Sequence, residues 1–309
     1  MGKFVLQFKE NIKEDEWHLG ICLHGFDDLK NNQIHWISNG KYQGKKWFAD
    51  PFILDFNEKE IHLLVEEFDY SLHRGRIAHL VVDRVKWEVI DCIIILDLTT
   101  HLSFPAIYRK GDKVYVCPEN HQSGEHDLYE YDRKAEKLIK LKALCLEELT
   151  DTTLNEYQGK WYMFTTSIPH PNGDTLEIKV AEKIEGPYEQ TQLVKFSEHI
   201  GRNAGQLFIY NDKLIRPAQE SYDVYGHAIV FQQVCIDDNG EFHFEEIFRY
   251  HSTHPKYNIG AHTFNVYKEM AVIDVKGYRH NLLGRFWNCM IKLAVKVGLK
   301  SPNTLLILM

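Results

Sequence analysis

Two aspartates, Asp50 and Asp151, stand at the same position in a short phrase that recurs along the chain. The phrase reads Phe-Ala-Asp-Pro-Phe at 48–52 and Thr-Asp-Thr-Thr-Leu at 150–154. Paired carboxylates suit sugar chemistry, because one must be ionised as a base or nucleophile while another is protonated as an acid. Glu67 and Glu119 each follow the apolar run after a copy of the phrase, so both are candidates for the acid. The alternative for each Asp is that it caps a turn by accepting backbone N–H groups.

Other polar residues at equivalent positions are candidates for holding a substrate: Ser103, Arg202, Asn203, Arg216, Gln219 and His262. Arg202 and Arg216 predict an anionic substrate group, a phosphate or carboxylate, since a guanidinium binds these groups at two points. The alternative for Arg216 is an ion pair with an acid at the rim of the site. His262 is a candidate acid, base or sugar ligand, or else a structural hydrogen-bonding residue.

Aromatic residues beside these positions offer faces on which sugars stack: Trp47, Phe48, Phe68, Tyr70, Phe104, Tyr222 and Tyr225. Core filling explains most aromatic residues in a β protein, so only those next to the polar positions are candidates.

The phrase itself occurs five times, and each copy is followed by a polar turn and a second apolar run. Aligning the copies at Asp50, Phe104, Asp151, Ala204 and His262 gives spacings of 54, 47, 53 and 58 residues. Repeated hairpins at this spacing predict an all-β five-bladed β-propeller, since a four-stranded blade needs about 40–50 residues. A propeller brings the starts of its inner strands together around one axis, so the candidate residues would share one pocket. A β-sandwich is the alternative, but it gives no reason for five matching phrases.

Three segments follow from this pattern. Residues 1–45 contain two strand-like runs that would supply outer strands or a lid, and residues 46–280 hold the propeller. Residues 281–309 are predicted to form a basic amphipathic C-terminal helix and tail, because apolar residues recur there at three- and four-residue steps. The helix, over 281–299, has an acid-free polar face with Trp287 on its apolar side, which is typical of a helix at a membrane surface. Packing on the propeller or a dimer contact are the alternatives.

The composition narrows the class of protein. The chain has 309 residues and a formal charge of −8, which argues against nucleic-acid binding. Its six cysteines are scattered without a CxxC pair, which suggests a reducing compartment. No signal-peptide pattern and no run of 18 apolar residues is present, so we expect a cytoplasmic protein, peripheral at the inner membrane face. We find no motif for a cofactor or a metal and expect neither.

The phrases at 48–52 and 150–162 resemble the blade 1 and blade 3 signatures of five-bladed propeller glycosidases of the glycoside hydrolase family 43-like group. That resemblance implies that Asp50 is the general base and that Asp151 tunes its pKa and position. A longer set of phrases, in order from 46 to about 277, is similar to the propeller domain of plant glucosamine inositolphosphorylceramide transferases and its bacterial stand-alone relatives. These phrases are Phe48–Phe52, Val65–Glu67, His101–Pro105, Pro118–Asn120, Gly201–Gly205, Arg216–Glu220, Tyr225–Gly226, Gly260–Thr263 and Val272–Asp274.

One departure from the glycosidase pattern bears on function. Family 43 glycosidases place the general-acid Glu at the start of the blade 4 inner strand, where this chain has Arg202-Asn-Ala-Gly205. The leading hypothesis is an enzyme that cleaves or transfers a glycosyl unit in surface-glycan or glycolipid metabolism. Asp50 would be its base or nucleophile, Asp151 the partner, and Glu119 or Glu67 the acid. The alternative is a non-catalytic glycan-binding or scaffold propeller that assists a glycosyltransferase, and a plain interaction propeller is a third hypothesis.

Overall fold

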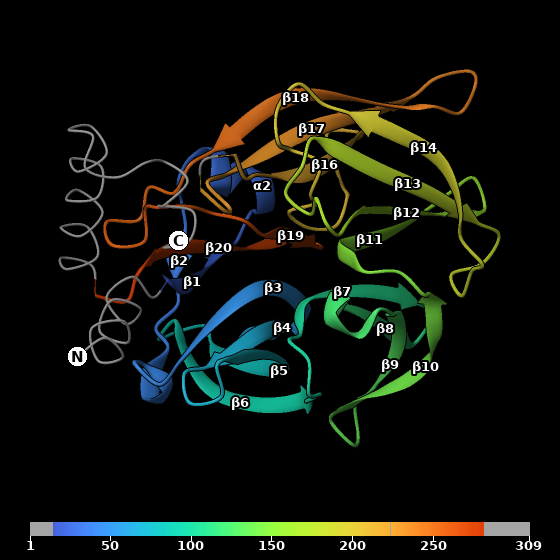
Figure 1. The fold of residues 1–309 in the computed structure, drawn as a ribbon. Coiled ribbons are helices and arrows are strands. Elements are labelled where there is room, and N and C mark those ends of the chain that lie inside the picture. Colours follow the sequence, from blue (N-terminus) through green and yellow to red (C-terminus); the bar gives the residue numbers. More distant parts are fainter. Residues whose placement is uncertain (1–14, 223, 281–309) are drawn as a thin grey trace, which may run out of the picture.

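The computed structural model describes residues 15–222 and 224–280, and within them the chain forms five four-stranded antiparallel sheets. Figure 1 shows these sheets arranged around a common centre, with β3, β7, β11 and β19 on their inner side. The predicted all-β five-bladed propeller is therefore confirmed. The repeats predicted from the sequence correspond to the inner two strands of each blade.

The strand bounds follow the chain from blade to blade. Blade 1 consists of β3 (Lys46–Phe56), β4 (Glu60–Asp69), β5 (Arg74–Asp83) and β6 (Glu88–Leu96). Blade 2 consists of β7 (Ser103–Lys110), β8 (Lys113–Glu119), β9 (His126–Asp132) and β10 (Lys137–Cys145). Blade 3 consists of β11 (Leu149–Tyr157), β12 (Lys160–Ser167), β13 (Thr175–Ala181) and β14 (Glu189–Lys195). Blade 4 consists of β15 (Phe208–Tyr210), β16 (Lys213–Glu220), β17 (Ala228–Ile236) and β18 (Phe242–Tyr250).

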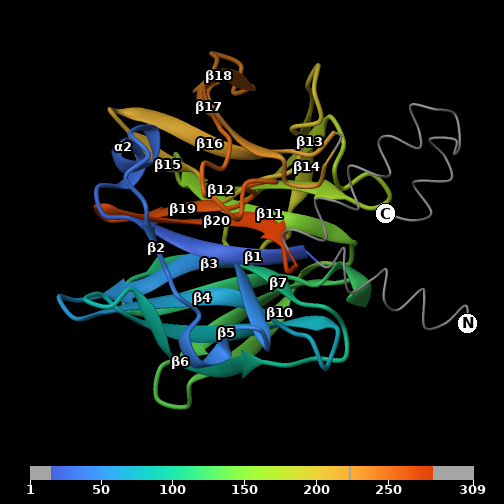
Figure 2. The ribbon, with the colours of Figure 1, turned by 90° about the vertical axis from the view of Figure 1, so that its left-hand side faces the viewer.

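Blade 5 is built from both ends of the described chain. Its inner strands are β19 (Phe264–Tyr267) and β20 (Met270–Tyr278), and its outer strands are β1 (Asp15–Cys22) and β2 (His35–Trp36). β1 pairs with β20 along its whole length, from Asp15 opposite Tyr278 to Cys22 opposite Ala271. Figure 2 shows the blue strand β1 beside the red strand β20. This pairing closes the ring, because the last blade is completed by residues some 250 positions earlier in the chain.

Apolar side chains fill the spaces between neighbouring blades. Every other residue of a strand points to the same face, so the two faces of each blade pack against the blades on either side. Phe26, on the short helix α2 (Gly25–Lys30), is buried against Phe231 of blade 4 and Phe264 of blade 5. The helix therefore helps to hold the last two blades together.

Helix is scarce in the described part of the chain: besides α2 there are two 3₁₀ turns, η1 (Gly40–Tyr42) and η2 (His121–Ser123). Among the described residues, none of these helices is of a length and apolarity suited to crossing a membrane. The amphipathic helix predicted for 281–299 lies outside the described residues.

Candidate functional site

The recurring phrase forms a β-bulge in the inner strand of three blades. Asp50, Phe104 and Asp151 have φ angles of 49°, 42° and 41°, in the left-handed region that residues other than glycine rarely adopt. At each of these residues the strand pairing shifts register, between Ala49 and Phe52 in blade 1, for example. A bulge re-aims side chains at the end of a strand, and here it occurs at the same point of each blade. The positions aligned in the sequence at Asp50, Phe104 and Asp151 are therefore also equivalent positions in the structure.

Carboxylates from a neighbouring blade bind the backbone N–H of each bulge. Asp274 accepts the N–H of Asp50 (2.8 Å), Asp50 accepts the N–H of Phe104 (3.1 Å), and Glu119 accepts the N–H of Asp151 (3.0 Å). The acids therefore do bind backbone amides, although across blades rather than within their own turns. Their first effect is to lock the inner ends of blades 5, 1, 2 and 3 into a fixed arrangement.

Asp50 lies in a buried network with three residues of blade 5. Its Oδ1 accepts the hydroxyl of Thr263 (2.6 Å) and lies 3.4 Å from Nε2 of His262, whose Nδ1 is 2.8 Å from Oδ1 of Asp274. Burial raises the pKa of Asp50 to about 6, against the opposing effect of His262. Burial opposes charge on His262, but Asp274 and Asp50 outweigh it and raise its pKa to about 9. Asp50 is thus an acid whose pKa lies close to neutrality beside a protonated histidine.

A second network surrounds Arg202, which precedes the inner strand of blade 4. Its Nε is 2.6 Å from Oδ2 of Asp151, and its Nη2 is 3.1 Å from both Oδ1 of Asp151 and Oε2 of Glu119. Nη1 donates to Oδ1 of Asn172 (3.1 Å), and His121 Nδ1 lies 2.9 Å from Oε1 of Glu119. One buried guanidinium therefore joins the carboxylates of blades 2 and 3 to blade 4.

The two carboxylates of this network have different pKa values. Burial favours the neutral form of Glu119, but Arg202 and hydrogen bonds from His121 and the Asp151 N–H hold its pKa well below the usual range. Burial and the neighbouring Glu119 raise the pKa of Asp151, against the effect of Arg202. Glu119 is therefore the fixed anion of the pair.

Tyr225 connects the two networks. Its ring lies 5.3 Å from the guanidinium carbon of Arg202 and meets the His262 ring edge-on, with centroids 5.5 Å apart. Trp17 stacks on the His262 ring, with ring centroids 3.7 Å apart, and meets Tyr225 edge-on at 6.4 Å. Burial raises the pKa of the Tyr225 phenol, which keeps it neutral. Tyr225 is half-buried, as are His121 and Asn172, whereas the acids, Arg202 and His262 are at most 9% exposed.

Three further buried residues, Asn203, Arg216 and Gln219, hold the central cluster, which consists of the Asp50 and Arg202 networks and Tyr225. Arg216 is fully buried and donates to Asn203 Oδ1 (2.9 Å), Gln232 Oε1 (2.6 Å) and the carbonyls of Ile200 and Gly201. Its partners are neutral oxygens, and burial lowers its pKa to about 9. Asn203 in turn donates to the Asp151 carbonyl (2.8 Å), and Gln219 donates to Asp151 Oδ2 (2.5 Å). Within the part of the chain that the structure describes, Arg216 therefore forms no ion pair with an acid at the rim of the site and does not contact the Asp151 carboxylate. Its hydrogen bond positions Asn203.

Two predicted residues lie apart from these contacts. Glu67 binds Arg76 at two points, both 3.0 Å, and also contacts Lys46, while its neighbour Glu66 faces His101 instead (3.2 Å). Adjacent strand residues point to opposite faces, which separates these two acids. Ser103 is buried at the start of β7, opposite Glu119 in the strand pairing.

Thr263 and Trp17 are not among the predicted site residues, and Asp274 is predicted only as the end of the phrase Val272–Asp274. Asp274 follows the second apolar run of the fifth repeat, which is the position of Glu119 in the second, so the repeat carried a signal for it. Trp17 reaches the cluster only because β1 completes blade 5, and no local pattern indicates that.

Asp50, His262 and Asp274 also form a set of possible metal ligands, with one atom from each within 4.8 Å of the others. A second set, Asp237, Glu241 and His243, is exposed. In the buried set each residue already has a hydrogen-bond partner, so hydrogen bonding alone explains why these side chains lie together.

Residues 33–276 match the family described as "Glucosamine inositolphosphorylceramide transferase 1, N-terminal". The chain belongs to this family. It is 27% identical over 195 residues to glucosamine inositolphosphorylceramide transferase 1 of Oryza sativa subsp. indica, a match that covers 60% of this chain. It is 26% identical over 215 residues to the Arabidopsis thaliana protein of that name, covering 65% of this chain. The matches span about a quarter of the length of these curated relatives, 26% and 27%.

Solved glycosidase structures have the same fold. An exo-β-1,3-galactanase from Phanerochaete chrysosporium with bound galactose superposes with a TM-score of 0.53 at 9% identity, covering 70% of this chain and 56% of that one. A family 43 β-1,3-galactosidase with galactodeoxynojirimycin gives 0.52 at 9% identity, covering 70% and 82%. At this identity the likeness shows the propeller fold, which the family 43 resemblance of the sequence predicts.

Proposed function

We propose that this chain is a carbohydrate-recognition propeller that holds a sugar for glycosyl transfer and does not hydrolyse it. The observation that carries the proposal is the position of Arg202. Arg202 lies before the inner strand of blade 4, where the family 43 resemblance would place the general-acid Glu. It binds both Asp151 and Glu119. A glycosidase needs a protonated carboxyl group to give its proton to the leaving oxygen. Glu119, held as an anion by Arg202 and His121, has no proton to give. The pKa of Asp151 is raised, but both of its carboxylate oxygens already accept hydrogen bonds, from Arg202 and Gln219.

The sugar would bind against Tyr225 with polar groups of the cluster around it. An aromatic face beside charged and amide groups suits a pyranose, which has apolar C–H faces and hydroxyls at its edge. Gln219 Oε1 is a buried acceptor without a hydrogen-bond partner, although the amide nitrogen of the same side chain is bound to Asp151. A buried polar atom without a partner costs free energy, so a ligand hydroxyl donating to it would stabilise the complex.

The names of the relatives indicate the class of ligand. They are transferases named for glucosamine and inositolphosphorylceramide, and the family corresponds to their N-terminal region. We therefore propose an amino sugar or the inositol-containing head group of a glycolipid as the ligand, bound for a transfer reaction catalysed elsewhere.

Calorimetric titration with glucosamine and with inositol phosphate tests this proposal. Tyr225→Ala should weaken binding at least tenfold, by removing the stacking face. Tyr157→Ala is the matched control, because Tyr157 is 38% exposed and lies at the end of β11 remote from Asp151. Equal affinities for both variants and the unchanged protein would refute binding at the central cluster.

A second candidate, an enzyme that cleaves or transfers a glycosyl unit itself, is favoured by the Asp50–His262 pair. A pKa of about 6 at Asp50 suits a general base near neutral pH, and the protonated His262 beside it is a potential acid. Turnover of an aryl glycoside that is lost in Asp50→Asn, while glucosamine still binds, would establish this activity. The absence of turnover together with retained binding would support the recognition function.

The place of action remains a prediction, with a cytoplasmic location and membrane contact through 281–299. Liposome flotation of the full chain, compared with a chain lacking 280–309, checks the membrane contact. Equal flotation of both would contradict it.

A further inference from the structure

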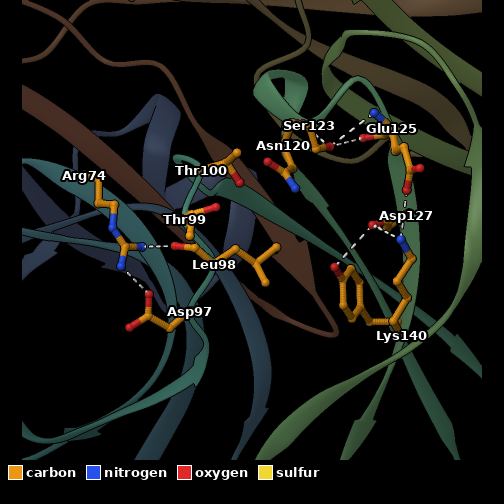
Figure 3. A pocket seen from close by; sticks show the side chains of 11 residues that line it. Arg74, Asp97, Leu98, Thr99, Thr100, Asn120, Ser123, Glu125, Asp127 and Lys140 are labelled. Carbon is orange, nitrogen blue, oxygen red and sulfur yellow. Dashed lines mark hydrogen bonds and ion pairs between the residues drawn. The ribbon is translucent and has the colours of Figure 1, made fainter.

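A cavity of about 590 Å³ lies between blades 1 and 2, and none of its lining residues belongs to the Arg202 or Asp50 networks. One wall comes from Arg74 at the start of β5 and from the connection 97–100 between β6 and β7. The other comes from η2, β9 and Lys140 of β10 (Figure 3). Its volume is within the range of small-molecule sites, about 300–1,000 Å³. Asn120 lines it directly after Glu119, so the cavity opens at the same strand end as the central cluster.

The charged groups of this cavity are already paired with one another. Arg74 Nη2 is 2.6 Å from Asp97 Oδ1, and Lys140 Nζ is 2.8 Å from Asp127 Oδ2 and 2.9 Å from Glu125 Oε2. The lining has two cationic and three anionic side chains, a net charge of −1. Such a surface repels phosphate and carboxylate groups and accepts a neutral or cationic ligand.

The side chain of Asn120 lines this cavity, and its Oδ1 makes no hydrogen bond within the described part of the chain. Asn120 is 4% exposed, and Figure 3 shows its amide pointing into the space between the two walls. Its backbone carbonyl accepts the N–H (3.0 Å) and hydroxyl (2.8 Å) of Ser123, so the η2 turn fixes this residue without using its side chain. Asp127 Oδ1 and Thr100 Oγ1 also lack partners. Three buried polar atoms without partners around one cavity indicate a ligand rich in hydroxyl groups.

We propose that this cavity is a second carbohydrate-binding site, which takes a hexose-sized sugar that is neutral or carries an amino group. The amide of Asn120 binds one hydroxyl, and the paired charges on the walls accept and donate to others. The site shares only its class of ligand with the proposed central site and does not depend on that site.

Two-dimensional NMR of the full chain, with glucose, glucosamine and inorganic phosphate as separate probes, tests the proposal. Glucose and glucosamine should shift the side-chain amide signals of Asn120, and phosphate should not. Thr99→Trp, at an exposed residue of the lining, should block the cavity and abolish these shifts. Leu146→Trp is the matched control, because Leu146 is 75% exposed in the connection from blade 2 to blade 3 and does not line the cavity.

Asn120→Ala separates a binding role from a structural one. It should weaken sugar binding roughly 3- to 10-fold, as expected for one lost hydrogen bond, while leaving the urea midpoint unchanged. Tyr225→Ala should leave the shifts at Asn120 intact, so failure of the central site is distinguishable from failure of this one. The proposal is overturned if neither sugar shifts the Asn120 amide, if Thr99→Trp leaves the shifts unchanged, or if phosphate produces the larger effect.

Discussion

Arg202 of blade 4 binds the carboxylate of Asp151 in blade 3 at two points, with Nε–Oδ2 at 2.6 Å and Nη2–Oδ1 at 3.1 Å. The same Nη2 reaches Glu119 of blade 2. At the position where the family 43 resemblance would place an acid, this chain thus has a guanidinium cation that binds two carboxylates. These contacts fix the geometry of the centre and hold Glu119 as an anion.

Replacing this arginine should destabilise the fold strongly. Arg202→Met leaves two buried carboxylates without their cation, a change that typically costs about 3–5 kcal/mol. Arg249→Met is the control, because Arg249 pairs at the surface with Glu198, Glu220 and Glu246 and should cost about 1 kcal/mol. Urea unfolding measures both, and a loss at Arg202 no larger than at Arg249 would contradict the network.

The His262 network makes stability depend on pH. The folded pKa of about 9 lies above the ordinary value of 6.5, so its contribution is complete below pH 6.5 and is lost as pH rises to about 9. The pKa of Asp50 is raised from 3.8 to about 6, so the contribution of Asp50 to stability is lost as the pH rises over that range. The free energy of unfolding should fall by on the order of 2–3 kcal/mol between pH 6.5 and 9. His262→Gln should flatten this dependence, and an unchanged slope in that variant would assign the effect to other groups.

Glu67 should matter for stability and not for sugar binding. Glu67→Gln removes the charge that holds Arg76 and Lys46, so it should cost about 1–3 kcal/mol in urea unfolding. The affinity for glucosamine should be unchanged in calorimetry. A loss of affinity with unchanged stability would place Glu67 in the binding site after all.

Gly205, within the blade 4 phrase, packs directly against blade 5. Its φ is +147°, and a Cβ there would lie 2.1 Å from the carbonyl oxygen of Phe264. Gly205→Ala should therefore lower the free energy of unfolding by about 2 kcal/mol or more, because the added Cβ disfavours this φ angle and clashes with the Phe264 carbonyl. Gly111→Ala, at φ +59° with open space around it, should cost about 1 kcal/mol. Similar thermal midpoints for the two variants would argue against close contact between these blades.

Much of the fold could be predicted from the sequence because its determinants are local. Each inner hairpin has its own phrase and turn, and the phrase marks the bulge at Asp50, Phe104 and Asp151. The sequence does not decide between outer strands and a lid for residues 1–45, because the pairing of β1 with β20 joins residues some 250 positions apart.

The candidate site was predictable in part, for the same reason. The alignment brought Asp50, Asp151 and His262 to one end of the strands, but partners and burial depend on packing between blades. The neutral surroundings of Arg216 and the stacking of Trp17 on His262 are examples. The opposite faces of Glu66 and Glu67 follow from strand alternation, and that signal was present in the sequence.

The central claim, recognition of a sugar without its hydrolysis, is tested most directly by following one labelled ligand through binding. The protein is incubated with a labelled glucosaminyl inositol phosphate, bound and free ligand are separated by equilibrium dialysis, and the chemical identity of the label is determined over time. We predict that the bound label remains the intact compound and that binding is weakened at least tenfold in Tyr225→Ala but unchanged in Tyr157→Ala. Release of free glucosamine that grows with time and disappears in Asp50→Asn would contradict the claim and establish a glycosidase.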